Sequence, residues 1–318
     1  MRTKPDKPRI SKAHFRRDLN ITLQAYSMYL PNLILFVVLG LYPIAWSIRY
    51  VFYHYTGNPI LKPVFVGLDN FVRVFVRDKT YWMTVGNTFI YAGGKILLTL
   101  PFAFAAAFIL NRPNRVNKVF QSLIFMPTIT SSAVMAMIFY LLFNLYNGEI
   151  NRYLMAWGIV DEPISWLNKY AMGTVIIVAA WGAIGNYMVY FLSALQMVPR
   201  ELLESGVIDG ANRWQSLIHI TLPMMTPILK IILMFIISSA FGDFGSIMVL
   251  TAGGPINKTM VMTLYAYKYL FPITVEGGSV ATEIGYGAAL SVVNGLIAGV
   301  MTGIYLWFGW RMDRIFDK

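Results

Sequence analysis

Long apolar stretches recur along this chain of 318 residues, and they constrain its fold more than any other feature. The six stretches are 26–53, 84–110, 119–145, 172–198, 224–251 and 286–310. A helix needs about 20 mostly apolar residues to cross a bilayer, and each stretch reaches that length. We therefore predict an all-α, polytopic membrane protein with six transmembrane helices, made of a basic tail over 1–25 and a membrane domain over 26–318.

Composition supports the membrane assignment and excludes several other classes. Hydrophobic residues make up 57% of the chain and charged residues 13%, whereas soluble domains carry about 25% charge. The absence of cysteine excludes disulfides and thiolate metal ligands. The three histidines lie in three different segments, so we predict no metal site. The net charge of +11 is expected because membrane proteins collect Lys and Arg in their cytoplasmic segments. The expected partner is therefore membrane lipid and not nucleic acid.

Basic residues are distributed unevenly between the segments that join the stretches. The N-terminal tail, the loops after the second and fourth stretches and the C-terminus hold 15 Lys and Arg residues, and the other three loops hold eight. Lys and Arg concentrate in cytoplasmic segments of membrane proteins. We therefore expect a multi-pass protein with both termini in the cytoplasm, as an even number of spans requires.

The loop between the fourth and fifth stretches, residues 199–223, has the features of a helix–turn–helix. Pro199, Glu201 and Glu204 suit a first helical turn, where acidic side chains meet the positive end of the helix dipole. Asp209-Gly210 is a turn signal at which a second short helix can begin. We predict a cytoplasmic helix–turn–helix between transmembrane helices 4 and 5.

Apolar residues recur in this segment every three to four positions, which predicts one apolar stripe. The stripe consists of Leu203, Val207, Ala211, Trp214 and Ile218. The opposite face carries Glu201, Asp209, Asn212, Arg213 and Gln215. We expect the stripe to pack toward the membrane and the polar face to meet a cytoplasmic partner. An amphipathic loop that packs well and binds nothing is the alternative.

The same segment resembles the "EAA" signature of permease subunits in binding-protein-dependent bacterial importers. The signature is Glu-Ala-Ala, three residues, Gly, nine residues, then Ile-x-Leu-Pro. The residues at that spacing are Glu204, Gly210, Ile220, Leu222 and Pro223. Ser205 and Gly206 replace the two alanines. Both are small, although Gly costs up to about 1 kcal/mol of helix stability relative to Ala.

Other short motifs extend the likeness over most of the chain from Tyr42 onward. Thr251-Ala-Gly-Gly-Pro255 is similar to a turn of sugar permeases of the maltose and glycerol-phosphate type. Three further motifs are similar to segments of the same permeases: Asn87-Thr88, the end of the second stretch at Asn111-Arg112, and Phe125-Met-Pro127.

This resemblance implies an oligosaccharide importer of the bacterial cytoplasmic membrane that works by alternating access. It implies three partners: a cytoplasmic ATPase dimer, a second homologous permease subunit and an extracytoplasmic solute-binding protein. The residues it implies in ATPase coupling are Glu201, Glu204, Ser205, Gly206, Asp209, Gly210, Ala211, Arg213, Ile220, Leu222 and Pro223. The chain has no Gly-x-x-x-x-Gly-Lys-Ser/Thr loop. We therefore expect no cofactor and no enzyme activity in this chain, with ATP and Mg²⁺ bound by the partner ATPase.

Polar residues that share faces of apolar helices are candidates for the substrate path, because such groups are costly in lipid. The pairs are Asn186 and Tyr190 in span four, Ser239 and Asp243 in span five, and Ser291 and Asn294 in span six. A cavity lined by these spans suits sugar hydroxyls, and interhelical hydrogen bonding is the alternative role.

Lys95 is a charged residue well inside span two. It can pair with Asp243, or it can face the cavity and attract an anionic group. The second case leads to the hypothesis that the substrate is an acidic oligosaccharide such as a uronate.

Two other classes compete with the importer. A secondary transporter driven by an ion gradient predicts a repeat between halves and paired carboxylates at the membrane midplane. The sequence shows no convincing repeat, and Asp243 is the only acidic residue well inside a span. A membrane-embedded enzyme predicts a cluster of His or carboxylates, which the sequence does not show.

Overall fold

The computed structural model describes residues 12–316 except 59, 273, 276–277 and 280–281, so the predicted basic tail is described only from Lys12 onward. The N-terminal third contains α1 (Lys12–Leu35), η1 (Phe36–Leu41), α2 (Tyr42–Arg49), η2 (Tyr50–Phe52), α3 (Asp69–Val72), η3 (Arg73–Arg77) and α4 (Lys79–Leu110). The middle contains α5 (Arg115–Ile129), α6 (Ser132–Leu142), α7 (Glu149–Ala156) and α8 (Ala171–Gln196). The remainder contains α9 (Arg200–Ile208), α10 (Arg213–Ser216), η4 (Leu217–Thr221), α11 (Leu222–Gly242), α12 (Gly245–Leu250), α13 (Met262–Leu270) and α14 (Ile284–Phe316).

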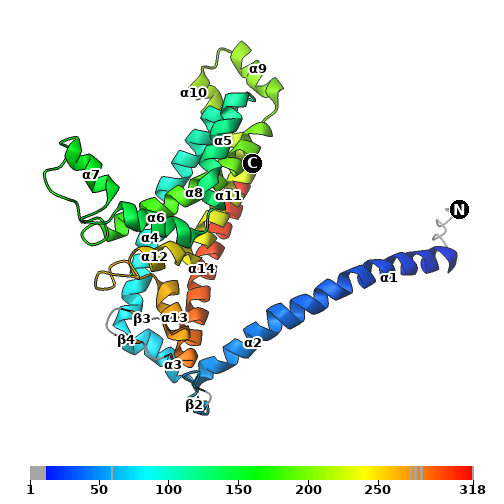
Figure 1. The fold of residues 1–318 in the computed structure, drawn as a ribbon. Coiled ribbons are helices and arrows are strands. Elements are labelled where there is room, and N and C mark those ends of the chain that lie inside the picture. The colour runs from blue at the N-terminus through cyan, green and yellow to red at the C-terminus, as the bar shows by residue number, and fades with distance from the viewer. Residues whose placement is uncertain (1–11, 59, 273, 276–277, 280–281, 317–318) are drawn as a thin grey trace.

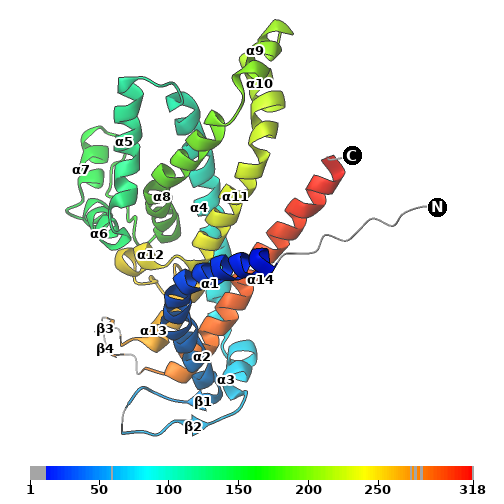
Figure 2. The same cartoon turned by 90° about the vertical axis from the view of Figure 1, so that its right-hand side faces the viewer.

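The long helices α4, α8, α11 and α14 form an elongated bundle (Figure 1). Helices α9 and α10 lie at one end of it, and α3 lies at the other (Figure 2). Two short antiparallel ladders complete the described secondary structure. They pair β1 (Tyr53–His54) with β2 (Val64–Phe65) and β3 (Thr274–Val275) with β4 (Gly278–Ser279). The fold is thus essentially all-helical, as predicted.

Among the described residues, five helices are long and apolar enough to cross a membrane, and a sixth span is counted if the bent pair α5–α6 is one span. The expected six spans are present on that count. The prediction of a continuous third span is wrong, because α5 and α6 meet at 97°. Thr130 and Ser131 adopt extended backbone at that junction.

The fifth predicted span is also interrupted. Helix α11 ends at Gly242, Asp243 adopts extended backbone, and α12 begins at Gly245. Broken backbone at membrane depth is tolerated where protein buries it or where it lines a cavity. The two interruptions are therefore candidate walls of a cavity within the membrane part of the chain.

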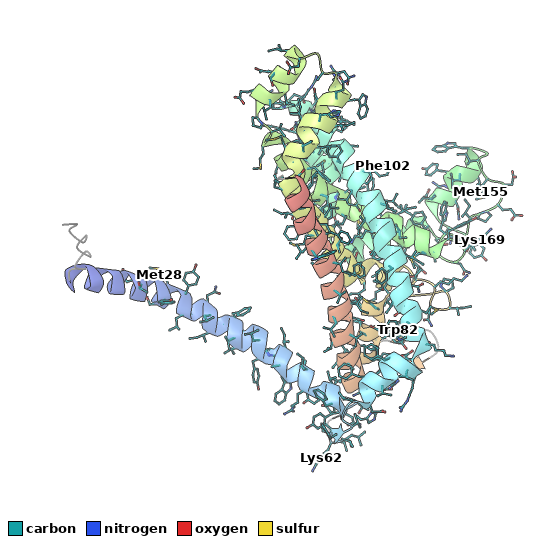
Figure 3. All side chains as sticks on the ribbon, turned by 180° about the vertical axis from the view of Figure 1, so that it is seen from behind. Met28, Lys62, Trp82, Phe102, Met155 and Lys169 are labelled. Atoms are coloured by element: carbon teal, nitrogen blue, oxygen red, sulfur yellow. The ribbon has the colours of Figure 1, made fainter. Side chains whose placement is uncertain are left out.

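The first span stands apart from the bundle. From Gln24 to Arg49 no side chain is buried, and the side chains around Met28 have no protein beside them (Figure 3). The helical path from α1 to η2 joins the rest of the chain near the start of α14. This helix exposes apolar side chains on every face, so in a membrane it is available to lipid or to another subunit.

Helices α5 and α8 approach closely at Gly185. A Cβ atom built there would lie 2.5 Å from the backbone oxygen of Ile124 and 2.8 Å from the Cα atom of Phe125. Because backbone atoms cannot move aside cheaply, only glycine fits at this crossing.

We expect Gly185→Ala to lower the free energy of unfolding by about 1–3 kcal/mol, the usual cost of overpacking. Gly182→Ala is the matched control on the same helix. Its added Cβ atom meets only the Met135 side chain, at 2.3 Å from Cε, and a methionine side chain adapts. Thermal unfolding of the detergent-purified variants tests this, and equal melting temperatures for the two variants would contradict it.

Candidate functional site

The segment 199–223 folds as a helix–turn–helix at the end of the bundle, as predicted. Gly210 ends α9 with φ of 83°, a left-handed conformation that favours glycine. Asn212 and Gln215 then form a capping box at α10: the Gln215 backbone N–H donates to Asn212 Oδ1 at 2.9 Å, and the Asn212 N–H donates to Gln215 Oε1 at 2.8 Å. Reciprocal caps satisfy free amide groups at a helix start, so this short helix has a defined beginning.

The predicted direction of the apolar stripe is wrong for most of its members. Val207, Trp214 and Ile218 are exposed, and Ile208 beside them is 85% exposed. The side that packs inward consists of Leu203, Gly206, Ala211, Leu217 and Ile220, which are buried or half-buried. The physical reason is the sharp turn at Gly210, which changes the helix axis, so that one helical period does not run through both helices.

Two of the predicted coupling residues, Gly206 and Ile220, pack against each other. A Cβ atom at Gly206 would lie 2.5 Å from Ile220 Cδ1, the movable end of a side chain. A small residue is therefore needed here, and alanine can be accommodated. The other predicted coupling residues that stay exposed are Glu201, Glu204, Ser205, Asp209, Gly210, Arg213 and Pro223, while Leu222 is half-buried.

A cavity of about 260 Å³ lies between the two interruptions of the spans. Its lining residues are Lys95, Pro127, Thr128, Thr130, Ser132, Met135, Ala179, Gly182, Ala183, Asp243 and Ser246. They come from α4, the α5–α6 junction, α8 and the α11–α12 junction. The volume is small beside ligand pockets of about 300–1,000 Å³.

Lys95 and Asp243 meet in this cavity. Lys95 Nζ donates to Asp243 Oδ2 at 2.7 Å, and the Tyr91 hydroxyl donates to the same oxygen at 2.6 Å. The Lys95 side chain is 7% exposed and that of Asp243 is 24% exposed. The predicted pairing is thus present, and both charged groups also border the cavity. The charge of Lys95 is compensated within the chain.

The other predicted path residues do not line this cavity. Asn294 is buried, accepts from the Tyr81 hydroxyl at 2.8 Å and donates to the Met262 carbonyl at 2.9 Å, which is interhelical bonding. Ser291 donates to the Gly287 carbonyl. Ser239 contacts the Tyr187 hydroxyl at 3.2 Å.

Asn186 and Tyr190 are half-buried on α8, and the Tyr190 ring packs against Phe235. Neither of them lines the cavity at Lys95 and Asp243, so their place in a substrate path stays a prediction.

Sequence reasoning missed the hydroxyl groups of the cavity. Thr128 Oγ1 donates to the Gly182 carbonyl at 3.0 Å and ties α5 to α8. Ser246 is 2% exposed. The Tyr91 hydroxyl interacts with it, so Ser246 belongs to the polar wall that Tyr91, Lys95 and Asp243 form. The run Pro127-Thr-Ile-Thr-Ser-Ser132 in the middle of an apolar stretch was the signal that could have revealed this site.

At the end opposite α9 and α10, a polar cluster fixes the start of α4. Asp78 accepts hydrogen bonds from the hydroxyls of Tyr265, at 2.8 Å, and Tyr286, at 2.6 Å. Burial, together with hydrogen bonds to Tyr269 and Asp78, raises the pKa of Tyr265 far above its usual value. Tyr265 therefore stays protonated and acts as a donor, so this cluster serves to hold α4, α13 and α14 together.

Comparison with known proteins agrees with this geometry. Residues 99–314 match the family described as "Binding-protein-dependent transport system inner membrane component". The lactose transport system permease protein LacF of Rhizobium radiobacter is 32% identical over 280 residues, covering 86% of this chain and 89% of LacF. The arabinooligosaccharides transport system permease protein AraP of Bacillus subtilis is 30% identical over 308 residues, covering 94% of this chain and 93% of AraP.

A solved structure shares the fold. It is a chain of a bacterial ABC transporter involved in the import of the acidic polysaccharide alginate, with a TM-score of 0.76 and 22% identity, covering 93% of this chain and 98% of that one. The family match spans more than half of the chain and includes the whole segment 199–223. The chain therefore belongs to the binding-protein-dependent transport system inner membrane components, the multi-pass permease subunits of ABC importers, in which a partner ATPase binds the ATP.

Proposed function

We propose that this permease carries oligosaccharides into a bacterial cell by alternating access, driven by an ATPase dimer that binds the segment 199–223. The observation that carries the proposal is the exposed apolar face at the signature, where Val207, Ile208, Trp214 and Ile218 have no cover within the described chain. Exposed apolar patches of this kind mark protein interaction sites. We infer that this face, and not the polar face expected from the sequence alone, is the ATPase contact.

The excess of basic residues in alternate segments supports a cytoplasmic location for both termini and for α9 and α10. ATP binding would then draw the α9–α10 ends of two permeases together and tilt the spans. Work of this kind requires ATP to favour one conformation over the other. The cavity at Lys95 and Asp243 lies between two broken helices, a place where a small rotation changes access.

A second permease subunit would complete the path. The cavity is small, and α1 and α2 leave the bundle with every side chain from Gln24 to Arg49 uncovered. We infer that a homologous subunit packs against this span and supplies the facing wall of the pathway. An extracytoplasmic binding protein would deliver the sugar at the end opposite α9 and α10.

An oligosaccharide is the proposed substrate class because relatives at 30–32% identity are named for lactose and arabinooligosaccharides. An acidic oligosaccharide is the finer proposal. The solved chains of similar fold belong to an alginate importer.

Uptake of a panel of labelled oligosaccharides tests the proposal in a strain that lacks this subunit. Restoring the chain should restore uptake of one group of the panel, and an ATPase should co-purify with it from detergent extracts. Restored uptake that continues without ATP, driven by an ion gradient, would contradict the proposal and favour a secondary transporter.

A further inference from the structure

A second and larger cavity, of about 910 Å³, lies away from α9 and α10. Its walls are the end of α6, the segment 165–168, the loop 251–257 after α12, and Lys268 of α13. Helices α6 and α12, which support it, lie side by side (Figure 1). The volume is that of a ligand pocket of about 300–1,000 Å³, and none of the functions described above uses it.

One wall of this cavity is a loop with strained backbone. Ala252, Ile256 and Asn257 have φ of 48°, 47° and 61°, and a β-branched residue such as Ile256 rarely adopts that conformation. The loop is held by Asn87 Nδ2, which donates to the Asn257 carbonyl at 2.9 Å, and by Thr259 Oγ1, which donates to the Gly254 carbonyl at 2.6 Å. In proteins generally, residues that neighbouring contacts hold in strained backbone conformations cluster at ligand sites.

The lining combines aromatic rings with amides. Trp166 donates its indole N–H to Asn151 Oδ1 at 2.9 Å, which fixes the ring in the wall, and Tyr140 lines the cavity beside it. The side-chain amides of Asn168 and Asn257 have no partner among the described residues. Aromatic faces and free amides are the groups that receive the apolar faces and the hydroxyls of sugars.

Lys268 provides the charge of this cavity. Among the described lining residues it is the only charged one. Its Nζ donates to the Ala252 carbonyl at 2.9 Å, and no described carboxylate forms an ion pair with it. Burial lowers the pKa of Lys268, which shows a cation partly removed from water without an anion to compensate it. Lys95 differs, because Asp243 neutralises it.

We propose that this cavity is an entry subsite for an acidic oligosaccharide, in which Lys268 pairs with the carboxylate of one sugar unit. Asn168 and Asn257 bond the hydroxyls of that unit, and Tyr140 and Trp166 contact its ring faces. The inference rests on the proposed function and deepens it by assigning the residues that bind the acidic unit.

The test compares uptake of a labelled uronate trisaccharide and a neutral hexose trisaccharide in cells that carry the full-length chain with its natural partners. We expect Lys268→Gln to raise the half-saturating concentration of the uronate sugar by about tenfold, because a hydrogen bond to a charged group is lost. The neutral sugar should change less than about twofold, the conservative Lys268→Arg should restore uronate uptake, and Lys258→Gln should change neither. Lys258 is the matched control, since it lies on the same side, is exposed and does not line the cavity.

Three outcomes would overturn the inference. The first is uronate uptake by the Lys268→Gln variant that equals the wild type. The second is an equal loss of uptake for both sugars, which would indicate that Lys268 supports the loop or the docking of a binding protein. The third is a wild-type chain that takes up only the neutral sugar. The last outcome leaves the proposed import of oligosaccharides intact and excludes only the acidic substrate. Failure of an ATPase to co-purify with the wild-type chain counts against the proposed function itself, so the two failures are distinguishable.

Discussion

Replacing Lys95 by methionine should lower the free energy of unfolding by about 3 kcal/mol, because breaking a buried ion pair leaves one charge uncompensated. The remaining charge is Asp243, which is 24% exposed and keeps only the Tyr91 hydroxyl as a described donor. The estimate lies at the lower end of the usual range because the cavity gives Asp243 some access to water. Thermal unfolding of the detergent-purified variant measures the loss.

The double variant Lys95→Met with Asp243→Asn provides the control. Removing both charges removes the uncompensated one, so much of the lost stability should return. A double variant that is less stable than either single variant would show that the ion pair is not the source of the effect. Because Lys95 is compensated, we also expect Lys95→Met to reduce uptake of neutral and acidic oligosaccharides alike, in contrast to Lys268→Gln.

Replacing Trp214 by serine should weaken binding of the partner ATPase by about 30-fold or more. Buried tryptophans at interfaces contribute about 2 kcal/mol or more, and about 1.4 kcal/mol corresponds to a factor of ten. Trp214 is 72% exposed in this chain, so its loss should leave the fold intact. The fraction of ATPase retained on affinity-purified permease measures the effect, and oligosaccharide uptake should fall with it.

Trp157 offers a matched control for this experiment. It is also 72% exposed, but it follows α7, away from α9 and α10. Trp157→Ser should leave ATPase retention unchanged. Equal retention by the Trp214 and Trp157 variants would show that the apolar face of the coupling segment is not the ATPase contact.

The uncovered first span and the small cavity have one explanation in the proposed assembly. Both are features of a chain that provides half of a transport path. In a bilayer the apolar side chains from Gln24 to Arg49 would contact lipid until a partner covers them. The interruption of two spans around Lys95 and Asp243 places non-helical backbone beside the cavity.

The sequence alone determined the membrane class, the number of spans and the coupling signature. These features are local: a bilayer requires about 20 consecutive apolar residues, and the signature lies within the single segment 199–223. The position of Gly210 in it predicted the turn, and the structure agrees. Pro223 does not begin a separate helix, because α10, η4 and α11 follow one another without a break in helical backbone.

Only the tertiary structure decided the direction of each face and the identity of the cavity residues. The turn at Gly210 reorients α10, so the helical period predicted the wrong exposed side. Lys95 and Asp243 are 148 positions apart. Tyr81, whose hydroxyl donates a hydrogen bond to Asn294, is 213 positions away from it. Periodicity along one helix cannot show which neighbour a polar group meets. That choice depends on how helices distant in the sequence pack, and this packing made Asn294 a structural contact and Ser246 a buried hydroxyl of the cavity wall.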